Sequence, residues 1–136
     1  MIRPIVKDPL ALARRSKPAG REDIQTAMDL ADTLRANIDR CVGMAANMIG
    51  AHSRVIAFCD GPAIRLMLNP EILRRAQPFE AEEGCLSLSG TRSATRYGRI
   101  VVRWQDLEMK THTDTYEGFT AQIIQHEIDH CDGILI

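Results

Sequence analysis

The stretch "GFTAQIIQHEIDHCDG", residues 118–133, predicts an amphipathic helix close to the C-terminal end of the chain. Thr120 has a side chain suited to capping the first turn, and Gly133 is a residue type that commonly follows the last turn. The apolar residues recur at helical spacings, at Phe119, Ile123, Ile124 and Ile128. We therefore expect this helix to bury one face, with the rest of the chain packed around it.

The same helix carries two histidines four residues apart, His126 and His130, with Glu127 next to the first. Residues at this spacing share a helix face with Cβ atoms about 5–6 Å apart, so both imidazoles can reach one ion. Glu127 flanks the pair, where a carboxylate can accept a proton from a metal-activated water. This His-Glu-x-x-His pattern predicts a metal site with a general base, and the alternative is a solvated helix whose polar residues face water.

A metal site needs a third protein ligand, and only "CDGILI" follows His130. The other metal-binding residue types considered are Asp129, Cys131, His52 and His112. The first two point away from the histidine pair on a helix, and the last two stand alone in polar segments typical of surface histidines. Cys85 is favoured, because it follows a glycine that lets the backbone approach closely and its thiolate is a soft ligand for Zn(II) or Fe(II).

The segments before this helix predict one further helix and then several strands. Residues 21–40 place apolar side chains three and four apart, as in an amphipathic helix of about five turns, at Ile24, Met28, Ala31, Leu34 and Ile38. The expected strands are "RVIAFCD" (54–60), "AIRLMLN" (63–69), "RIVVRW" (99–104) and "KTHTDTYEG" (110–118). Asn69 and Pro70 should end the second strand, and "EGCLSLSG" (83–90) should be a loop or a bulged strand. Residues 1–20 should form an extended arm with one short helical turn.

These elements predict an α+β fold in a single domain, residues 1–136. Antiparallel strands should pack around the C-terminal metal-binding helix, and the helix at 21–40 should cover the core. The length suits one domain with a modest core.

Composition excludes several classes of function. The net charge is −1, from 17 basic and 18 acidic residues, so we expect no direct binding of nucleic acid. No apolar segment is long enough to cross a membrane, and the first 20 residues lack the pattern of a secretion signal. We therefore expect a cytoplasmic protein with free cysteine thiols and no membrane partner.

Three segments together resemble the signature motifs of peptide deformylases, in the family's order. They are "CVGMAANMIG" (41–50), "EGCLS" (83–87) and "QHEIDH" (125–130). The resemblance implies that Cys85, His126 and His130 hold one divalent ion, Fe(II) in the cell with Zn(II) or Ni(II) able to replace it, while Glu127 is the general acid and base. It further implies a hydrolase of protein biosynthesis that removes the N-formyl group from N-formylmethionyl peptides of nascent chains and releases formate.

The resemblance also implies how the formyl oxygen is held. Family members use the backbone N–H after the cysteine, here Leu86, and a glutamine side chain at the position of Met48, which has no N–H to donate. Loss of such a donor costs about 2.7–4 kcal/mol in other acyl-transfer sites, so we predict a reduced rate. Asn47 carries an amide, but adjacent side chains of an extended segment face opposite sides. The expected substrate-binding residues are Val42, Gly43 and Glu83.

Four arginines follow the cysteine motif, at Arg92, Arg96, Arg99 and Arg103. We interpret them as a solvated strand edge. The alternative is that Arg92 or Arg96 is a structural or substrate-binding arginine of the family.

Two functions from different classes fit this sequence. The first is a working deformylase of reduced activity, and the second is a catalytically impaired relative that keeps the metal and binds formylated or other peptides in a regulatory role. Retention of Glu127, which binding alone does not require, favours catalysis. An ordinary His-Glu-x-x-His zinc protease fits less well, because Cys85 takes the place of its usual third ligand. Some deformylases contact the ribosome through a C-terminal extension that is absent here, so we expect no stable ribosome docking.

Overall fold

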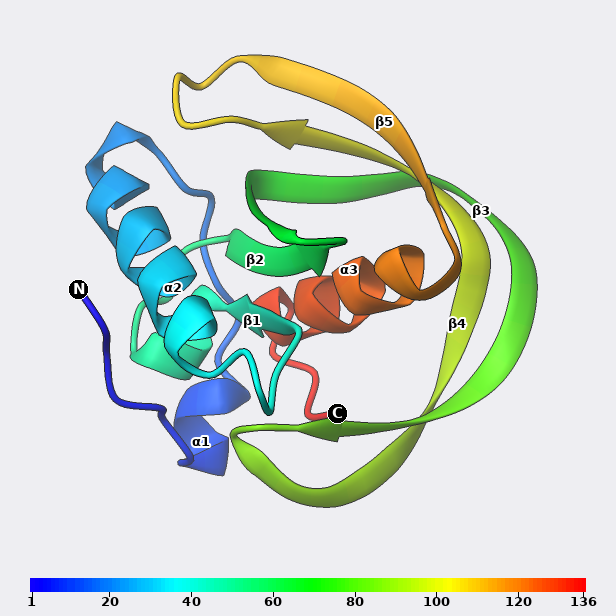
Figure 1. Ribbon diagram of the computed structural model, residues 1–136, viewed down its shortest axis with the longest axis horizontal. Helices are drawn as coiled ribbons and strands as arrows, with labels where there is room; N and C mark the ends of the chain where they lie inside the picture. The colour runs from blue at the N-terminus through cyan, green and yellow to red at the C-terminus, as the bar shows by residue number, and fades with distance from the viewer.

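The computed structural model describes all residues, 1–136, and shows the predicted α+β fold (Figure 1). In chain order the elements are α1 (Pro9–Leu12), the 3-10 turn η1 (Arg21–Asp23), α2 (Ile24–Ala36), β1 (Gly43–Ala45), the 3-10 turn η2 (Ala46–Ile49), β2 (Val55–Asp60), β3 (Ala63–Cys85), β4 (Leu88–Gln105), β5 (Thr111–Glu117) and α3 (Gly118–Cys131). No helix is long and apolar enough to span a membrane.

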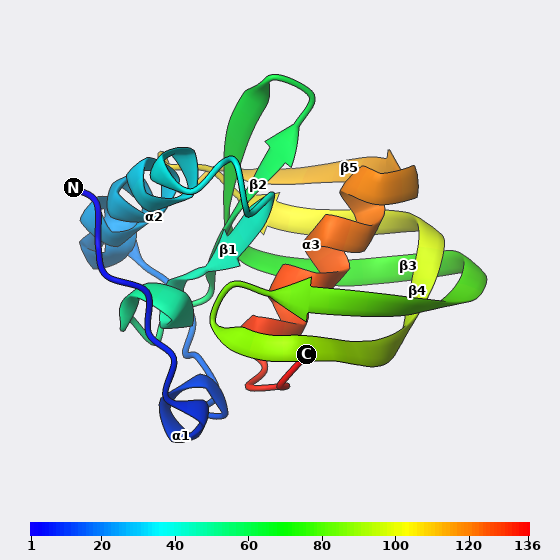
Figure 2. The same cartoon turned by 60° about the horizontal axis from the view of Figure 1, so that its bottom comes forward.

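The strands form one antiparallel sheet of five strands in the order β1-β2-β3-β4-β5. Strands β3 and β4 are long and curve around α3, so this helix lies inside the bend of the sheet (Figures 1 and 2). Helix α2 lies on the other side of β1 and β2, as Figure 2 shows. The His-Glu-x-x-His pattern is therefore carried on a helix enclosed by the sheet (Figures 1 and 2).

Strand β2 is buried on both faces, which explains its uninterrupted apolar sequence "VIAF". Successive side chains alternate between two core clusters: Val55 and Ala57 pack on the side of α2, while Ile56 and Phe58 pack on the side of α3. The two helices thus cover opposite faces of the same strand, and α3 packs against the face that carries Ile56 and Phe58.

Helix α2 is shorter than the predicted 21–40, and its buried face is rotated from the predicted one. Ala27, Leu30 and Leu34 are buried, whereas Met28 and Ile38 are about half exposed. Apolar residues span a wide arc of this helix, so periodicity alone did not select the side that packs. Helix α2 nevertheless covers the core, as predicted.

The prediction that Asn69 and Pro70 end a strand is wrong, because β3 continues through them to Cys85. The pairing with β4 shifts register between Leu68 and Glu71, so the proline that lacks an N–H lies at a bulge. Asn69 adopts a positive φ of 51° there, and its side-chain amide donates to the carbonyl oxygen of Ala19 at 2.9 Å. Asn69 and Pro70 therefore lie at a bend within β3 and do not end it.

The segment 83–90, predicted as a loop or bulged strand, forms the end of β3, a tight turn and the start of β4. The register shifts between Gly84 and Cys85, and Cys85 pairs with Leu88 across the turn. Helix α3 begins at Gly118, so Thr120 lies inside its first turn instead of capping it. Phe119, expected in the core, is 64% exposed, because the first turn of α3 lies at the rim of the cleft described below.

Candidate metal centre

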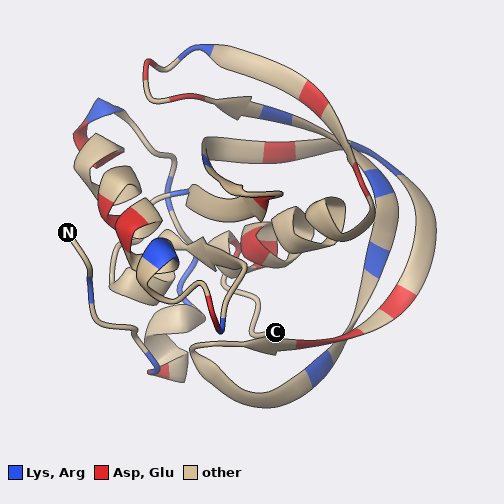
Figure 3. Cartoon of the chain, viewed as in Figure 1, with Lys and Arg blue, Asp and Glu red and all other residues tan.

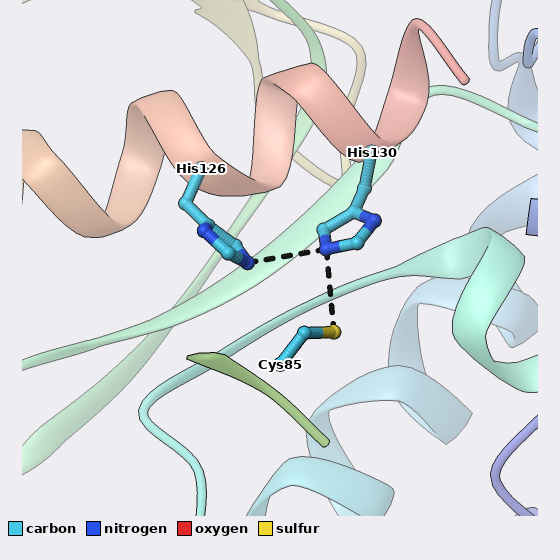
Figure 4. Close-up of side chains that lie close together, drawn as sticks. All are labelled: Cys85, His126 and His130. Atoms are coloured by element: carbon cyan, nitrogen blue, oxygen red, sulfur yellow. Dashed lines mark hydrogen bonds between the residues drawn. The ribbon is translucent and has the colours of Figure 1, made fainter. Parts of the chain in front are cut away.

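The side chains of Cys85, His126 and His130 converge between the end of β3 and the buried face of α3 (Figure 4). One ligand atom from each of the three lies within 4.8 Å of the others. The two Nε2 atoms are 3.1 Å apart, and the Cys85 sulfur is 3.4 Å from the Nε2 atom of His130. The cluster joins residues that are 45 positions apart in the sequence.

These separations fit a tetrahedral ion. Zn–N bonds of about 2.05 Å at the tetrahedral angle place two nitrogens about 3.3 Å apart, and a Zn–S bond of about 2.3 Å places sulfur and nitrogen about 3.6 Å apart. The observed distances are within about 0.2 Å of both values. Asp129, Cys131, His52 and His112 lie outside the cluster. The donor set of one thiol and two imidazoles therefore fits a divalent ion such as Zn(II) or Fe(II).

A cleft of about 530 Å³ opens onto the cluster and is lined by residues from all three motif segments. Val42 and Gly43 line it from the first segment, and Leu86 lines it from the turn after Cys85. Along α3 the lining residues are Phe119, Gln122, Ile123, His126 and Glu127, which share one helix face. The cleft thus exposes the cluster to a ligand of peptide size.

Glu127 is buried beside the cluster, with 4% of its surface exposed. Burial raises the pKa of its carboxyl group to about 7. Its Oε1 atom has no hydrogen-bond partner although it is inaccessible to solvent. A buried carboxylate with a free oxygen and a pKa near neutrality is poised to take up or release a proton.

Gly43 packs directly against this carboxylate. A Cβ atom placed on Gly43 would lie 2.7 Å from Oε2 of Glu127 and 2.7 Å from Cγ2 of Ile123, closer than van der Waals contact allows. Gly43 was expected to bind substrate. In the structure it lines the cleft, and the absence of a side chain there makes room for Glu127.

Glu83 lies at the centre of a buried charged network behind His126. One oxygen lies 2.8 Å from Nδ1 of His126 and 2.7 Å from Arg96, and the other accepts a hydrogen bond from Gln122 at 2.8 Å. Burial alone would raise the pKa of Glu83, but hydrogen bonds from His126, Arg96 and Gln122 outweigh it and lower the pKa to about 2. Glu83 therefore remains ionised and orients the imidazole of His126.

The interpretation of Arg96 as part of a solvated strand edge is wrong. Its side chain is 4% exposed, and it donates to Asp129 at 2.6 Å as well as to Glu83. By contrast, Arg99 and Arg103 are at least half exposed, as the solvated edge predicts. The exposed curve of β3 and β4 carries charges of both signs (Figure 3). Apolar periodicity did not distinguish Arg96 from its neighbours, and the alternative of a structural arginine at Arg92 or Arg96 agrees with the burial and pairing of Arg96.

The two histidines of the cluster differ in protonation. Burial lowers the pKa of His130 to about 3, so its imidazole is neutral, the form that binds metals. Burial also opposes the charge of His126, but its contacts with Cys85 and Glu83 outweigh burial and raise the pKa to about 10. The surroundings of His126 thus favour positive charge, which a metal cation would supply.

Met48 and Asn47 lie in η2, so the expectation of an extended segment there is wrong. Met48 is 1% exposed and belongs to the apolar core on the side of α2, outside the cleft lining. The Asn47 amide donates to the carbonyl oxygens of His130 at 2.8 Å and Leu12 at 3.3 Å. Both of its amide hydrogens are used, so Asn47 does not replace the missing glutamine.

Unlike the side-chain amide of Asn47, the backbone N–H of Leu86 is not used as a donor within the fold. Leu86 lies in the two-residue turn between β3 and β4 and lines the cleft next to Cys85. No turn or loop hydrogen bond in the structure uses its N–H as a donor. A donor that is free of the fold and adjacent to the cluster is available to a ligand in the cleft.

The site is of the kind found in mononuclear metallohydrolases. A curved antiparallel sheet surrounds a helix, and two histidines, a cysteine and a buried glutamate lie at one cleft. The polypeptide deformylase family model matches residues 2–136, so the chain belongs to the peptide deformylase family, as its motifs predicted. This family is metal-dependent.

Similar proteins match over nearly the full chain. A peptide deformylase of Clostridium beijerinckii is 50% identical over 136 residues, covering 100% of both chains. The crystal structure of the Thermotoga maritima peptide deformylase superposes with a TM-score of 0.88 at 30% identity, covering 99% of this chain and 95% of that one. A Met-Ala-Ser-bound peptide deformylase structure from Acinetobacter baumannii matches with a TM-score of 0.88 at 28% identity, covering 99% and 97%.

Proposed function

We propose that this protein hydrolyses the N-formyl group of N-formylmethionyl peptides and releases formate. Membership of the peptide deformylase family supports the reaction, and the Acinetobacter baumannii relative that binds Met-Ala-Ser supports a peptide ligand with an N-terminal methionine. The observation that carries the proposal is the free, buried oxygen of Glu127 beside the Cys85, His126 and His130 cluster in one cleft.

In this proposal Cys85, His126 and His130 hold one divalent ion, with Fe(II) as the cellular metal and Zn(II) or Ni(II) as substitutes. Such an ion, when bound, polarises the formyl carbonyl and makes an attacking water more acidic. Glu83 holds the ring of His126 in one orientation through its hydrogen bond to Nδ1. The neutral imidazole of His130 needs no deprotonation before it binds.

Glu127 takes the proton from the attacking water and later gives it to the departing amine nitrogen. Its pKa of about 7 suits both transfers, because a base and its conjugate acid are then both populated near neutral pH. The Leu86 N–H donates to the formyl oxygen as negative charge develops on it. Because Met48 supplies no second donor, the proposed rate is below that of a site with glutamine at this position.

We propose a cytoplasmic location with nascent chains as partners, and no direct contact with nucleic acid or membranes. The second candidate is a catalytically impaired protein that binds metal and formylated peptides in a regulatory role. The observation that favours it is the burial of Met48 away from the cleft. Binding of a formyl-Met peptide without formate release would support this second candidate.

The test is formate release from formyl-Met-Ala-Ser by protein loaded with Fe(II) without oxygen, with metal content measured for each sample. We expect turnover by the wild type and a loss of at least about 10²-fold in Glu127→Gln, since the general base is removed. Glu108→Gln, which changes an exposed glutamate, should keep the wild-type rate. Equal formate release by the wild type and Glu127→Gln at equal metal content would contradict the proposal.

A further inference from the structure

Gln122 is the one side-chain amide that lines the cleft, and it touches the network that holds a metal ligand. Its Nε2 atom donates to Oε2 of Glu83 at 2.8 Å, while the other oxygen of Glu83 lies 2.8 Å from His126. This single bond fixes the amide, because Glu83 is itself held by Arg96. Gln122 is therefore a rigid polar group in the wall of the cleft.

The amide of Gln122 has hydrogen-bonding capacity to spare. A primary amide has two N–H donors and a carbonyl acceptor, and the structure uses one N–H. The carbonyl oxygen takes part in no hydrogen bond and is not among the buried atoms that lack a partner, so it is accessible, and the second N–H belongs to a side chain that lines the cleft. An accessible amide in a cleft wall can bind a polar atom of a ligand.

The amide also lies on the wrong side of His126 to replace the glutamine absent at position 48. It binds Glu83, which contacts Nδ1 of His126, whereas the cluster forms at Nε2 on the opposite edge of the ring. A role in holding the formyl oxygen is therefore excluded. The group faces another part of the ligand.

The distance along α3 indicates which part of the ligand Gln122 faces. Gln122 precedes His126 by four residues, or about 6 Å along the helix axis. Five bonds, the first of them the planar amide bond, join the formyl carbon of a formyl-Met peptide to its sulfur, a span of about 6 Å when extended. A peptide whose formyl group lies at the cluster and whose first side chain runs along α3 places its sulfur beside Gln122, between Phe119 and Ile123.

We propose that Gln122 is a specificity-determining residue that donates a hydrogen bond to the polar atom of the substrate's first side chain. The thioether of methionine is only a weak acceptor, whereas the S=O group of methionine sulfoxide is a strong one of similar shape. The chain therefore accepts formylated peptides that begin with oxidised methionine as well as those that begin with methionine. This inference rests on the proposed function and adds a second substrate class to it.

The test compares three formyl-Xaa-Ala-Ser peptides in which Xaa is methionine, methionine sulfoxide or norleucine, an apolar analogue of methionine. The measured quantity is the ratio of kcat/KM for the sulfoxide to kcat/KM for norleucine, which cancels any general loss of activity. Gln122→Leu should lower this ratio about tenfold, because the S=O group loses its donor. Turnover of the methionine peptide by the wild type tests the proposed function separately.

Gln25→Leu is the matched control, since Gln25 also lies on a helix and donates to a carboxylate, that of Asp29 at 2.8 Å, but outside the cleft. It should leave the ratio unchanged. An unchanged ratio in Gln122→Leu, or an equal fall in Gln25→Leu, would overturn the inference. If the wild type shows no turnover, the same ratio is taken from dissociation constants of the peptides, measured by calorimetry, and the same outcomes decide.

Discussion

Replacing Gly43 by alanine tests the placement of Glu127 with a single methyl group. The new Cβ would lie 2.7 Å from Oε2 of Glu127, so the carboxylate must move by about 0.7 Å to regain a contact of 3.4 Å. Ile123 blocks the same Cβ at 2.7 Å, and Glu127 is buried, so neither neighbour can turn freely into solvent. The methyl group therefore displaces Glu127, the proposed general base.

The expected effect on catalysis is large and selective. A misplacement of about 1 Å can cost about 10²-fold in rate, so Gly43→Ala should lower kcat by about 10- to 100-fold. Overpacking should lower the free energy of unfolding by about 1–3 kcal/mol. The metal content should not change, because Gly43 is not part of the Cys85, His126 and His130 cluster.

Formate release, metal content and thermal unfolding are measured together for this variant. Gly84→Ala is the comparison, because a Cβ there meets only the carbonyl oxygen of Gly90, at 3.7 Å. It adds the same methyl group to the neighbourhood of Cys85 without touching Glu127, and it should lose much less activity. A Gly43→Ala protein with kcat within twofold of wild type would refute this account of Glu127.

Three further outcomes follow from the buried network and the first motif. Arg96→Met should lower the free energy of unfolding by about 3–5 kcal/mol, because it leaves the carboxylates of Glu83 and Asp129 without their buried partner. It should also weaken metal affinity about 10- to 100-fold. Chemical denaturation measures the first effect and metal titration the second. Met48 belongs to the apolar cluster against which Cys85 and Leu86 pack, so Met48→Gln places an amide donor next to these two residues and should raise formate release about tenfold or more. The buried amide should cost about 1–3 kcal/mol of stability, and unchanged release would show that the donor is not limiting. The pKa of Glu83 is lowered from 4.5 to about 2, so its stabilising contribution is complete above pH 4.5 and is lost as the pH falls through about 2; Glu83→Gln should remove this part of the acid dependence of the unfolding free energy.

The pairing of His126 and His130 in the candidate metal site was predictable because helix geometry is local. The spacing of His126 and His130 fixes a shared face before any tertiary contact forms, and α3 keeps both side chains on that face. The third ligand came from residue chemistry and from family resemblance, and the structure brings Cys85 to the histidines. The part of the site that could be predicted from the sequence is therefore the part that depends on a single helix and on known motifs.

The charged network was not predictable in the same way. Arg96 meets Glu83 across a strand pair and Asp129 across the core, at separations of 13 and 33 residues. Nothing local to Arg96 distinguishes it from Arg99, which is exposed on the same strand. The register of β3 with β4 decides which arginine faces inward, and that register depends on bulges near Pro70 and Gly84 that periodicity does not reveal.

The structure also explains why the loss of the first-motif glutamine is not repaired locally. The segment folds as η2, in which Asn47 uses both amide hydrogens to tie the carbonyl oxygens of Leu12 and His130 together. Met48 fills the apolar cluster on the side of α2, against which Cys85 and Leu86 also pack, and its thioether has no N–H to donate. The free N–H of Leu86 is then the donor that these segments leave to the cleft.

In the proposed mechanism, oxyanion stabilisation therefore depends on the rigidity of the two-residue turn that carries Leu86. Pairing of Cys85 with Leu88 closes that turn, and the burial of Ser87, which is 4% exposed, holds it against the core. A metal held by Cys85 would stiffen the same turn, because the ligand immediately precedes Leu86. Metal binding and placement of the remaining donor are thus coupled through one peptide unit, so a change that loosens the turn should weaken both at once.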